Sequence, residues 1–260
     1  MTQRPFHDST QRFTDRVADY VKYRPTYPRE VVMFLHATCG LAKGAQVADI
    51  GAGTGISARL FLDAGHPVVA VEPNQAMREA SVAWLADFED FSAVSGSAEA
   101  TTLADASVDL VIAAQAFHWF DPATARREFA RILKPGGLVA PFWNSRLLSG
   151  TPFLTGYEAL LKHYGVDYTE VSERYGDDVS MSAWFGDSFA HKAKFPNAQN
   201  LDFDGLKGRL MSSSYAPKPG HPNHEPMFAA LRELFDRTAQ NGTVEFAYDT
   251  RVYVGYAWKA

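Results

Sequence analysis

Three glycines at alternate positions, Gly51, Gly53 and Gly55, form a turn that a ligand could approach closely. Glycine lacks a Cβ, so it allows the sharp turns and the bare peptide surface against which a nucleoside can lie. An acidic residue, Glu72, follows at a distance of about 20 positions, where a carboxylate is suited to accept both hydroxyls of a ribose. This spacing predicts a nucleoside-binding site at the first turn of a strand–helix–strand unit.

The spacing of the glycines and the charge beside them distinguish between nucleosides. A dinucleotide-binding turn reads G-x-G-x-x-G, whereas Ile56 occupies the sixth place here. Asp49 stands just before the turn, where its carboxylate would repel a pyrophosphate and attract an ammonium or sulfonium group. S-adenosylmethionine carries both of these cations and a ribose, so it is the favoured ligand. An NAD-dependent oxidoreductase and a glycine turn that binds nothing are the alternatives.

Five segments of the chain occur in the order found in one known enzyme family. They are YVKYRPTYP (20–28), VADIGAGTGIS (47–57), VVAVEPNQAM (68–77), GSAEATTLADASVDLVIAAQAFHWFD (96–121) and RILKPGGLVAPFWN (131–144). The chain therefore resembles the class I S-adenosylmethionine-dependent methyltransferases, especially the small-molecule branch with ubiquinone-biosynthesis-type and trans-aconitate-type enzymes. The resemblance covers residues 10–146 well and residues 206–256 more loosely.

The resemblance implies a set of residues that bind the cofactor. Asp49 and the Gln115 carbonyl would meet the methionine ammonium, Trp119 would face the sulfonium, and Arg24 in an N-terminal lid would clamp the methionine carboxylate. Either Ser97 or Glu99 would meet the adenine amino group. The full expected set is Tyr20, Arg24, Asp49, Gly51, Ala52, Gly53, Gly55, Glu72, Pro73, Met77, Ser97, Ala98, Glu99, Gln115 and Trp119.

The methyl acceptor is expected near the ends of the N-terminal lid and the fifth strand. The residues assigned to it are Tyr27, Trp143, Asn144 and Arg146, and Arg146 would either bind a carboxylate substrate or pair with an acidic residue of a cap. His118 is the candidate general base, with a structural histidine as the alternative. No metal site is expected, because His221 and His224 lie three apart without a cysteine or acidic cluster.

Strands alternating with helices up to residue 145 predict an α/β fold with a doubly wound, mostly parallel, seven-stranded Rossmann-like sheet that has an antiparallel C-terminal strand. Residues 1–145 would form the cofactor-binding core with N-terminal lid helices. Residues 146–200 would form a helical cap inserted after the fifth strand, and residues 201–260 would complete the sheet. The alternating residues 244–256 predict an antiparallel strand pair or one long edge strand.

Composition narrows the function further. The formal charge of −5 argues against a nucleic-acid partner, and Cys39, the one cysteine among 260 residues, fits a reducing cytoplasm. No signal peptide or membrane-spanning segment is expected, and no oligomeric state follows from the sequence. The sequence thus predicts a cytoplasmic S-adenosylmethionine-dependent methyltransferase acting on a small molecule, with a non-catalytic S-adenosylmethionine-binding protein as a further alternative.

Overall fold

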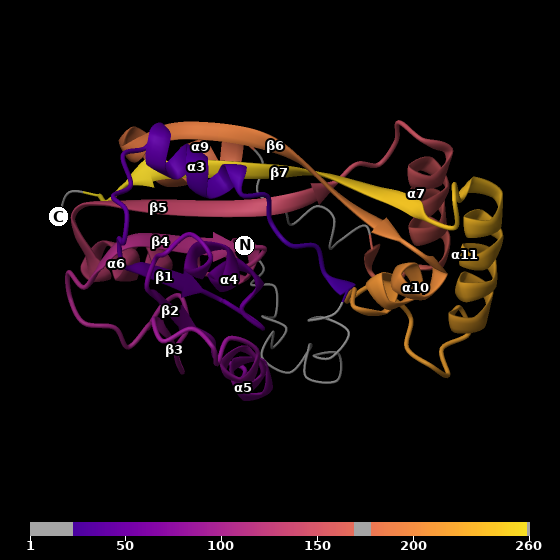
Figure 1. Cartoon of the computed structure of the whole chain (residues 1–260), viewed down its shortest axis with the longest axis horizontal. Helices are drawn as coiled ribbons and strands as arrows, with labels where there is room; N and C mark the ends of the chain where they lie inside the picture. Colours follow the sequence, from indigo (N-terminus) through magenta and orange to yellow (C-terminus); the bar gives the residue numbers. More distant parts are fainter. Residues whose placement is uncertain (1–22, 169–177, 259–260) are drawn as a thin grey trace, which may run out of the picture.

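The computed structural model describes residues 23–168 and 178–258, and its centre is a seven-stranded sheet of order β3-β2-β1-β4-β5-β7-β6 (Figure 1). Neighbouring strands from β3 to β5 pair in parallel, and β7 pairs antiparallel with both β5 and β6. The predicted α/β class and the mostly parallel sheet with one antiparallel strand are therefore confirmed. The strands are β1 (Val47–Ile50), β2 (Val68–Val71), β3 (Phe91–Val94), β4 (Val108–Ala114), β5 (Leu133–Arg146), β6 (Phe189–Leu201) and β7 (Val244–Tyr256).

Helices cover both faces of this sheet because its central strands are apolar on both sides. All four residues of β1 are buried. One face packs against α3 and α4, and the other packs against α6 and α9. Local capping fixes two helix starts, since the side chains of Asn74 and Asp121 accept hydrogen bonds from the backbone at Met77 and Thr124. The helices of this part are α3 (Glu30–Ala37), α4 (Ile56–Leu62), α5 (Gln75–Trp84), η2 (Phe117–Trp119), α6 (Pro122–Ile132), α9 (Asp178–Phe185) and η3 (Gly186–Ser188).

Three further helices form a cap beyond the end of the sheet to which β5 points (Figure 1). They are α7 (Pro152–Tyr164), α10 (Phe203–Met211) and α11 (His224–Thr238). Their apolar side chains share one buried cluster with the first residues of β7. Gly156 lets α7 approach α11, because a Cβ there would lie 2.4 Å from a methyl carbon of Leu234. The cap therefore stands over the carboxyl ends of the parallel strands, where open α/β sheets bind ligands.

The structure corrects the expected extent of the cap. The cap was expected to span residues 146–200, but residues 189–200 lie in β6, which pairs with β7 from Phe189 to Leu201. Pro196 weakens the strand signal in the sequence, and it is tolerated because β6 lies at the edge of the sheet. The segment 244–256 is one long strand, as one of the two expectations had it, but it lies inside the sheet and not at its edge.

Candidate active site

The turn after β1 needs glycine for two separate reasons. Gly51, Gly53 and Gly55 have φ angles of 69°, 56° and 88°, in the left-handed region that glycine adopts without strain. A Cβ on Gly51 would also lie 2.8 Å from the Cβ of Ala116, so the absent side chain leaves room between this turn and the end of β4. Gly51 and Gly53 both line the cavity described below.

Gly55 allows close packing beside the turn. A Cβ on Gly55 would lie 2.8 Å from a methyl carbon of Leu85 and 3.3 Å from Ser81, so this glycine lets the turn pack against the α5 region. It also forms the N-cap of α4. Gly55 lines neither of the two hollows described below.

Glu72, at the end of β2, is held by backbone groups. Its Oε2 accepts a hydrogen bond from the Gly53 N–H at 2.9 Å, and its Oε1 accepts one from the Asn74 N–H at 2.9 Å. Burial raises the pKa of this carboxyl, while the two backbone donors and Arg78 lower it. A carboxylate has about four lone-pair positions, so two remain on the cavity side for the hydroxyls of a ribose.

Asp49 lies beneath the turn and is fully buried. Its Oδ2 accepts a hydrogen bond from the Ser57 hydroxyl at 2.6 Å, but its Oδ1 makes no hydrogen bond to any residue that the structure describes. Burial, with a smaller contribution from the nearby Glu72, raises the pKa of Asp49 to about 7 in spite of the lowering effect of the Ser57 hydrogen bond. An orphaned carboxylate oxygen in this place fits the positive end of a ligand, reached directly or through water.

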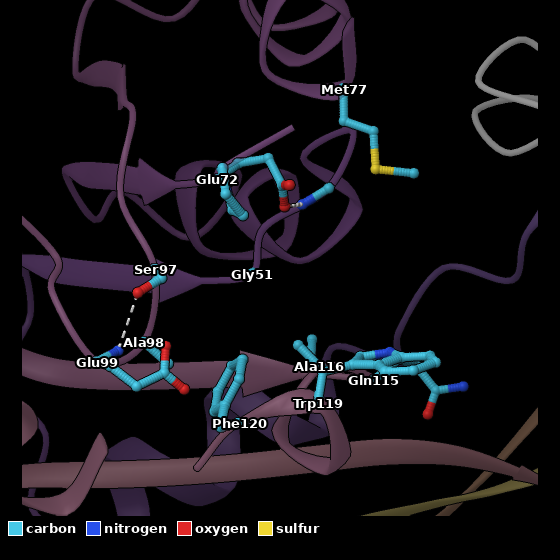
Figure 2. A pocket seen from close by; sticks show the side chains of 13 residues that line it. Gly51, Glu72, Met77, Ser97, Ala98, Glu99, Gln115, Ala116, Trp119 and Phe120 are labelled. Atoms are coloured by element: carbon cyan, nitrogen blue, oxygen red, sulfur yellow. Dashed lines mark hydrogen bonds between the residues drawn. The ribbon is translucent and has the colours of Figure 1, made fainter. Parts of the chain in front are cut away.

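A cavity of about 210 Å³ opens beside the turn (Figure 2). Ser97, Glu99 and Phe120 stand at one end, and Trp119 and Gln115 stand at the other, with Glu72 between the two ends on the opposite wall. The walls are mostly apolar, as is usual for small-molecule sites. The lining residues are Gly51, Gly53, Glu72, Pro73, Met77, Ser97, Ala98, Glu99, Ala114, Gln115, Ala116, Trp119 and Phe120.

The two candidates for binding an adenine amino group are placed side by side. The Ser97 hydroxyl accepts a hydrogen bond from the Glu99 N–H at 3.3 Å, and both residues line the cavity. Glu99 is already engaged, because its Oε1 accepts a hydrogen bond from the Asp121 N–H at 2.9 Å. Both residues remain candidates for this contact.

The chain reverses direction at the end of β4 through an unusual backbone conformation. Gln115 has a φ of 56°, which is rare for a residue with a side chain, and its N–H donates to the Phe142 carbonyl at 3.0 Å. The turn starts η2 and brings Trp119 and Phe120 into the cavity wall. The cavity is also lined by three residues that were not predicted from the sequence: Ala114, Ala116 and Phe120. Ala116, for example, lies against Gly51 of a distant segment, and no local sequence pattern reveals such a contact.

A smaller hollow of about 30 Å³ adjoins this cavity and shares Gly51, Gly53, Ala114 and Gln115 with it. The expected residues Arg24, Tyr27, Ala52 and Asn144 meet there, together with Pro25, Ile56 and Ser57, which were not expected as site residues. Asn144 ties the N-terminal segment to the sheet, since its Nδ2 donates to the Thr26 carbonyl at 3.1 Å. The Arg24 Nη2 donates to the Ser212 carbonyl at 2.7 Å and so reaches the cap.

Two residues assigned to the acceptor lie elsewhere. Trp143 is buried on the opposite face of β5 from Asn144, where its ring packs against Phe117 and Tyr253, because adjacent residues of a strand face opposite sides. Arg146 pairs with Glu158 of α7, so the expected alternative of an ion pair with the cap is the one observed.

The other expected residues are placed as follows. The His118 ring packs against that of Trp119, with 4.9 Å between the ring centroids, and does not line either hollow. Tyr20 lies outside the described residues. In the described part of the chain, no three His, Cys, Asp or Glu side chains converge on a common metal position. None of the helices in the same part is long and apolar enough to cross a bilayer.

Comparisons with known proteins place this site in a family. The family described as Methyltransferase domain matches residues 48–140. An uncharacterized methyltransferase of Schizosaccharomyces pombe is 33% identical over 245 residues, 93% of this chain and 95% of the relative. One of Mycobacterium tuberculosis is 40% identical over 139 residues, and this match spans only 54% of each protein.

Solved structures define the fold class. A protein of Anaeromyxobacter dehalogenans assigned as a type II methyltransferase has a TM-score of 0.68 at 20% identity, over 92% of this chain and 100% of that one. A Haemonchus contortus N-methyltransferase in complex with S-adenosylhomocysteine has a TM-score of 0.58 at 15% identity, over 100% of this chain and 61% of that one. The fold is the Rossmann-like fold of these methyltransferases. The chain belongs to the methyltransferase family, which confirms the resemblance to methyltransferases drawn from its motifs.

Proposed function

We propose that this protein transfers a methyl group from S-adenosylmethionine to a small-molecule acceptor. The observation that carries the proposal is the Glu72 carboxylate, which two backbone N–H groups hold at the cavity wall with acceptor positions remaining for a ribose diol. When bound, S-adenosylmethionine supplies a methyl group that its sulfonium activates for in-line displacement by a nucleophile on the acceptor.

The chain's own residues would bind, orient and shield the reactants. Asp49 and the Gln115 carbonyl would receive the ammonium, and Trp119 would present an aromatic face to the sulfonium, an attraction of about 0.5–2 kcal/mol. Arg24, in the adjoining hollow, would bind the methionine carboxylate. Holding donor and acceptor in line and away from water supplies most of what methyl transfer requires. His118, one side chain from the cavity, would act as a base if the accepting atom carries a proton.

The main rival is an NAD-dependent oxidoreductase. Asp49 lies beneath the glycine turn with one carboxylate oxygen that no described residue satisfies, and a second carboxylate, Glu72, stands beside it. Two acidic groups at this place oppose the binding of a pyrophosphate and favour a cationic ligand. A non-catalytic S-adenosylmethionine-binding protein would keep the same pocket but produce no methylated product.

Calorimetric titration with S-adenosylhomocysteine, and in parallel with NADH, tests the cofactor. The wild type should bind S-adenosylhomocysteine with micromolar affinity. The Glu72→Ala variant should bind it at least about 10-fold more weakly, because hydrogen bonds to a charged group contribute about 1.5–3 kcal/mol each. Glu79→Gln is the matched control, since this carboxylate lies on the exposed surface of α5, lines neither hollow and accepts a hydrogen bond from Gln75. Binding of NADH in place of S-adenosylhomocysteine would overturn the proposal.

A further inference from the structure

The buried guanidinium of Arg209, on α10, has no acidic partner in the described part of the chain. The residue is 6% exposed. Its Nε donates to the Tyr248 hydroxyl at 3.2 Å, its Nη1 donates to the Ser213 hydroxyl at 2.9 Å, and it lies 5.4 Å from the ring centre of Phe246. These neighbours are neutral, and Nη2 makes no hydrogen bond to a described residue. Burying a charge without a counter-charge costs free energy. The buried Arg209 guanidinium therefore indicates that a bound ligand supplies the missing negative charge.

A second unsatisfied group lies close to this guanidinium. Tyr157, on α7, is fully buried, and its hydroxyl makes no hydrogen bond to a described residue. Burial raises the pKa of Tyr157, as does the neighbouring Tyr215, while the positive charges of Arg209 and Arg146 lower it. The Tyr157 ring and the Arg209 guanidinium both pack against Phe246, at 4.9 Å and 5.4 Å from its ring centre, so an orphaned hydroxyl and an uncompensated cation lie in the same region between α7, α10 and β7.

The other arginine of this region is already neutralised. Arg146 forms an ion pair with Glu158, and its Nη2 also donates to the Tyr168 hydroxyl at 2.7 Å. Tyr168 in turn donates to Glu158 at 2.6 Å, and the exposed Lys162 also pairs with Glu158, at 3.3 Å. These groups occupy the Glu158 carboxylate, and Arg209 is not among them, so its charge is left uncompensated among the described residues.

Strands β5 and β7 and the side chain of Arg24 link the region around Arg209 to the proposed cofactor site. Arg146 pairs in register with Tyr248, and Asn144 pairs with Thr250. Alternate residues of a strand share a face, so the side chain of Arg146 follows that of Asn144, which lines the smaller hollow. Arg24, another residue of that hollow, donates to the carbonyl of Ser212, the C-cap residue of α10, and acts electrostatically on Tyr248.

We propose that Arg209 and Tyr157 bind the carboxylate of the methyl acceptor, which makes the acceptor a small carboxylic acid. This inference rests on the proposed function, because it assigns the substrate class of the same site. A carboxylate brings one negative charge, which balances Arg209, whereas a phosphate monoester brings about −1.5 to −2 and would exceed it. The Arg209 Nη2 and the Tyr157 hydroxyl are donors, and a carboxylate offers acceptor positions to both.

Two variants separate ligand binding from a structural role. Tyr157→Phe removes an oxygen that bonds no described residue, so it should leave the melting temperature unchanged or raised while weakening carboxylate binding. Arg209→Met replaces the cation by an apolar side chain of similar length and should abolish that binding. Tyr253→Phe is the matched control, because this buried hydroxyl lies on the other face of the sheet, where it donates to Asp178 at 2.7 Å.

The probes are benzoate and succinate, with benzamide and succinamide as uncharged counterparts and inorganic phosphate as the alternative anion. Each is titrated calorimetrically into protein with and without saturating S-adenosylhomocysteine. Wild type and Tyr253→Phe should bind at least one of the carboxylates and neither amide. Tyr157→Phe should bind it about 10-fold more weakly, as expected for the loss of one hydrogen bond to a charged group.

Three results would overturn the inference. They are failure of both carboxylates to bind the wild type, equal carboxylate affinity in wild type and Tyr157→Phe, and tighter binding of phosphate than of either carboxylate. Should Arg209→Met fail to fold, Tyr157→Phe still decides the question. If the wild type does not bind S-adenosylhomocysteine, the proposed function is refuted. If the wild type binds S-adenosylhomocysteine but neither carboxylate, only the assignment of the acceptor is refuted.

Discussion

The two sides of the site hold their charges in different ways. On the side of the glycine turn, backbone N–H groups of Gly53 and Asn74 hold the Glu72 carboxylate, and all three residues lie within one strand–helix–strand unit. On the cap side, side chains hold side chains, and Arg209 reaches Tyr248 across 39 positions of the sequence. A backbone donor is present whatever the side chain, so the first arrangement is encoded locally, whereas the second requires several distant residues to be correct together.

This contrast predicts that the cap depends most on its buried ion pair. Glu158→Ala leaves Arg146 uncompensated, and removing one partner of a buried pair costs about 3–5 kcal/mol of the free energy of unfolding. Urea unfolding measures that loss, and calorimetry should show unchanged affinity for S-adenosylhomocysteine. Asp63→Ala is the control, because it breaks the exposed pair with Arg59 and should cost about 0–1 kcal/mol. Equal losses in the two variants would contradict the contrast.

On the side of the turn, the largest effect should come from closing the space beside Gly51. Gly51→Ala places a Cβ 2.8 Å from that of Ala116 at a φ of 69°, so the turn must shift into the cavity. A residue with a side chain in this backbone region carries strain of about 1–3 kcal/mol. Affinity for S-adenosylhomocysteine should therefore fall about 10- to 100-fold, which corresponds to a free energy of this size. Gly136→Ala is the control, because Gly136 has a φ of 80° but a Cβ there would meet nothing within 4 Å. This variant has the same backbone strain without the steric contact and should bind S-adenosylhomocysteine normally. Normal binding by both variants would show that the cavity tolerates the side chain.

The buried Asp49 should make the unliganded protein sensitive to pH. Its pKa of about 7 in the folded state exceeds the ordinary value of 3.8. The folded protein therefore binds this proton more tightly than the unfolded chain does, and protonation of Asp49 stabilises the fold. Its contribution to stability is therefore present at low pH and is lost as the pH rises from about 4 to about 7. Urea unfolding at pH 5 and pH 8 should show a smaller decrease in Asp49→Asn than in wild type. The same decrease in both proteins would mean that Asp49 is ionised when folded.

The smallest effect should distinguish S-adenosylmethionine, the cofactor before methyl transfer, from S-adenosylhomocysteine, the product after it. Trp119→Leu removes an aromatic face beside the expected sulfonium and should weaken S-adenosylmethionine by about 0.5–2 kcal/mol. S-adenosylhomocysteine has no positive sulfur, so its affinity should change less. His163→Gln is the control, because His163 is exposed on α7 and lines neither hollow. Equal weakening of both ligands by Trp119→Leu would mean that the indole contributes contact area only.

The sequence-based predictions succeeded where residues close in the chain form the site, and they failed where the result depends on how distant elements pack. The turn residues Gly51 and Gly53, together with Glu72, were predicted as a site and line one cavity. Trp143 was assigned to the acceptor and lies in the core, because a one-residue step along β5 changes the face of the sheet. The β6 strand was mistaken for part of the cap, since Pro196 is compatible with a strand only at an edge, and edge position is a property of the assembled sheet.

The sequence by itself determined the parallel α/β core, the glycine turn and the carboxylate that follows it, because strand and helix periodicity and turn chemistry act between residues close in the chain. The tertiary structure alone decided that Ala116 faces Gly51, that Arg146 pairs with Glu158, and that Arg209 is buried without an acid among the described residues. These contacts join residues of separate elements. Their existence depends on how the elements pack, and packing is a property of the whole fold that no local pattern carries.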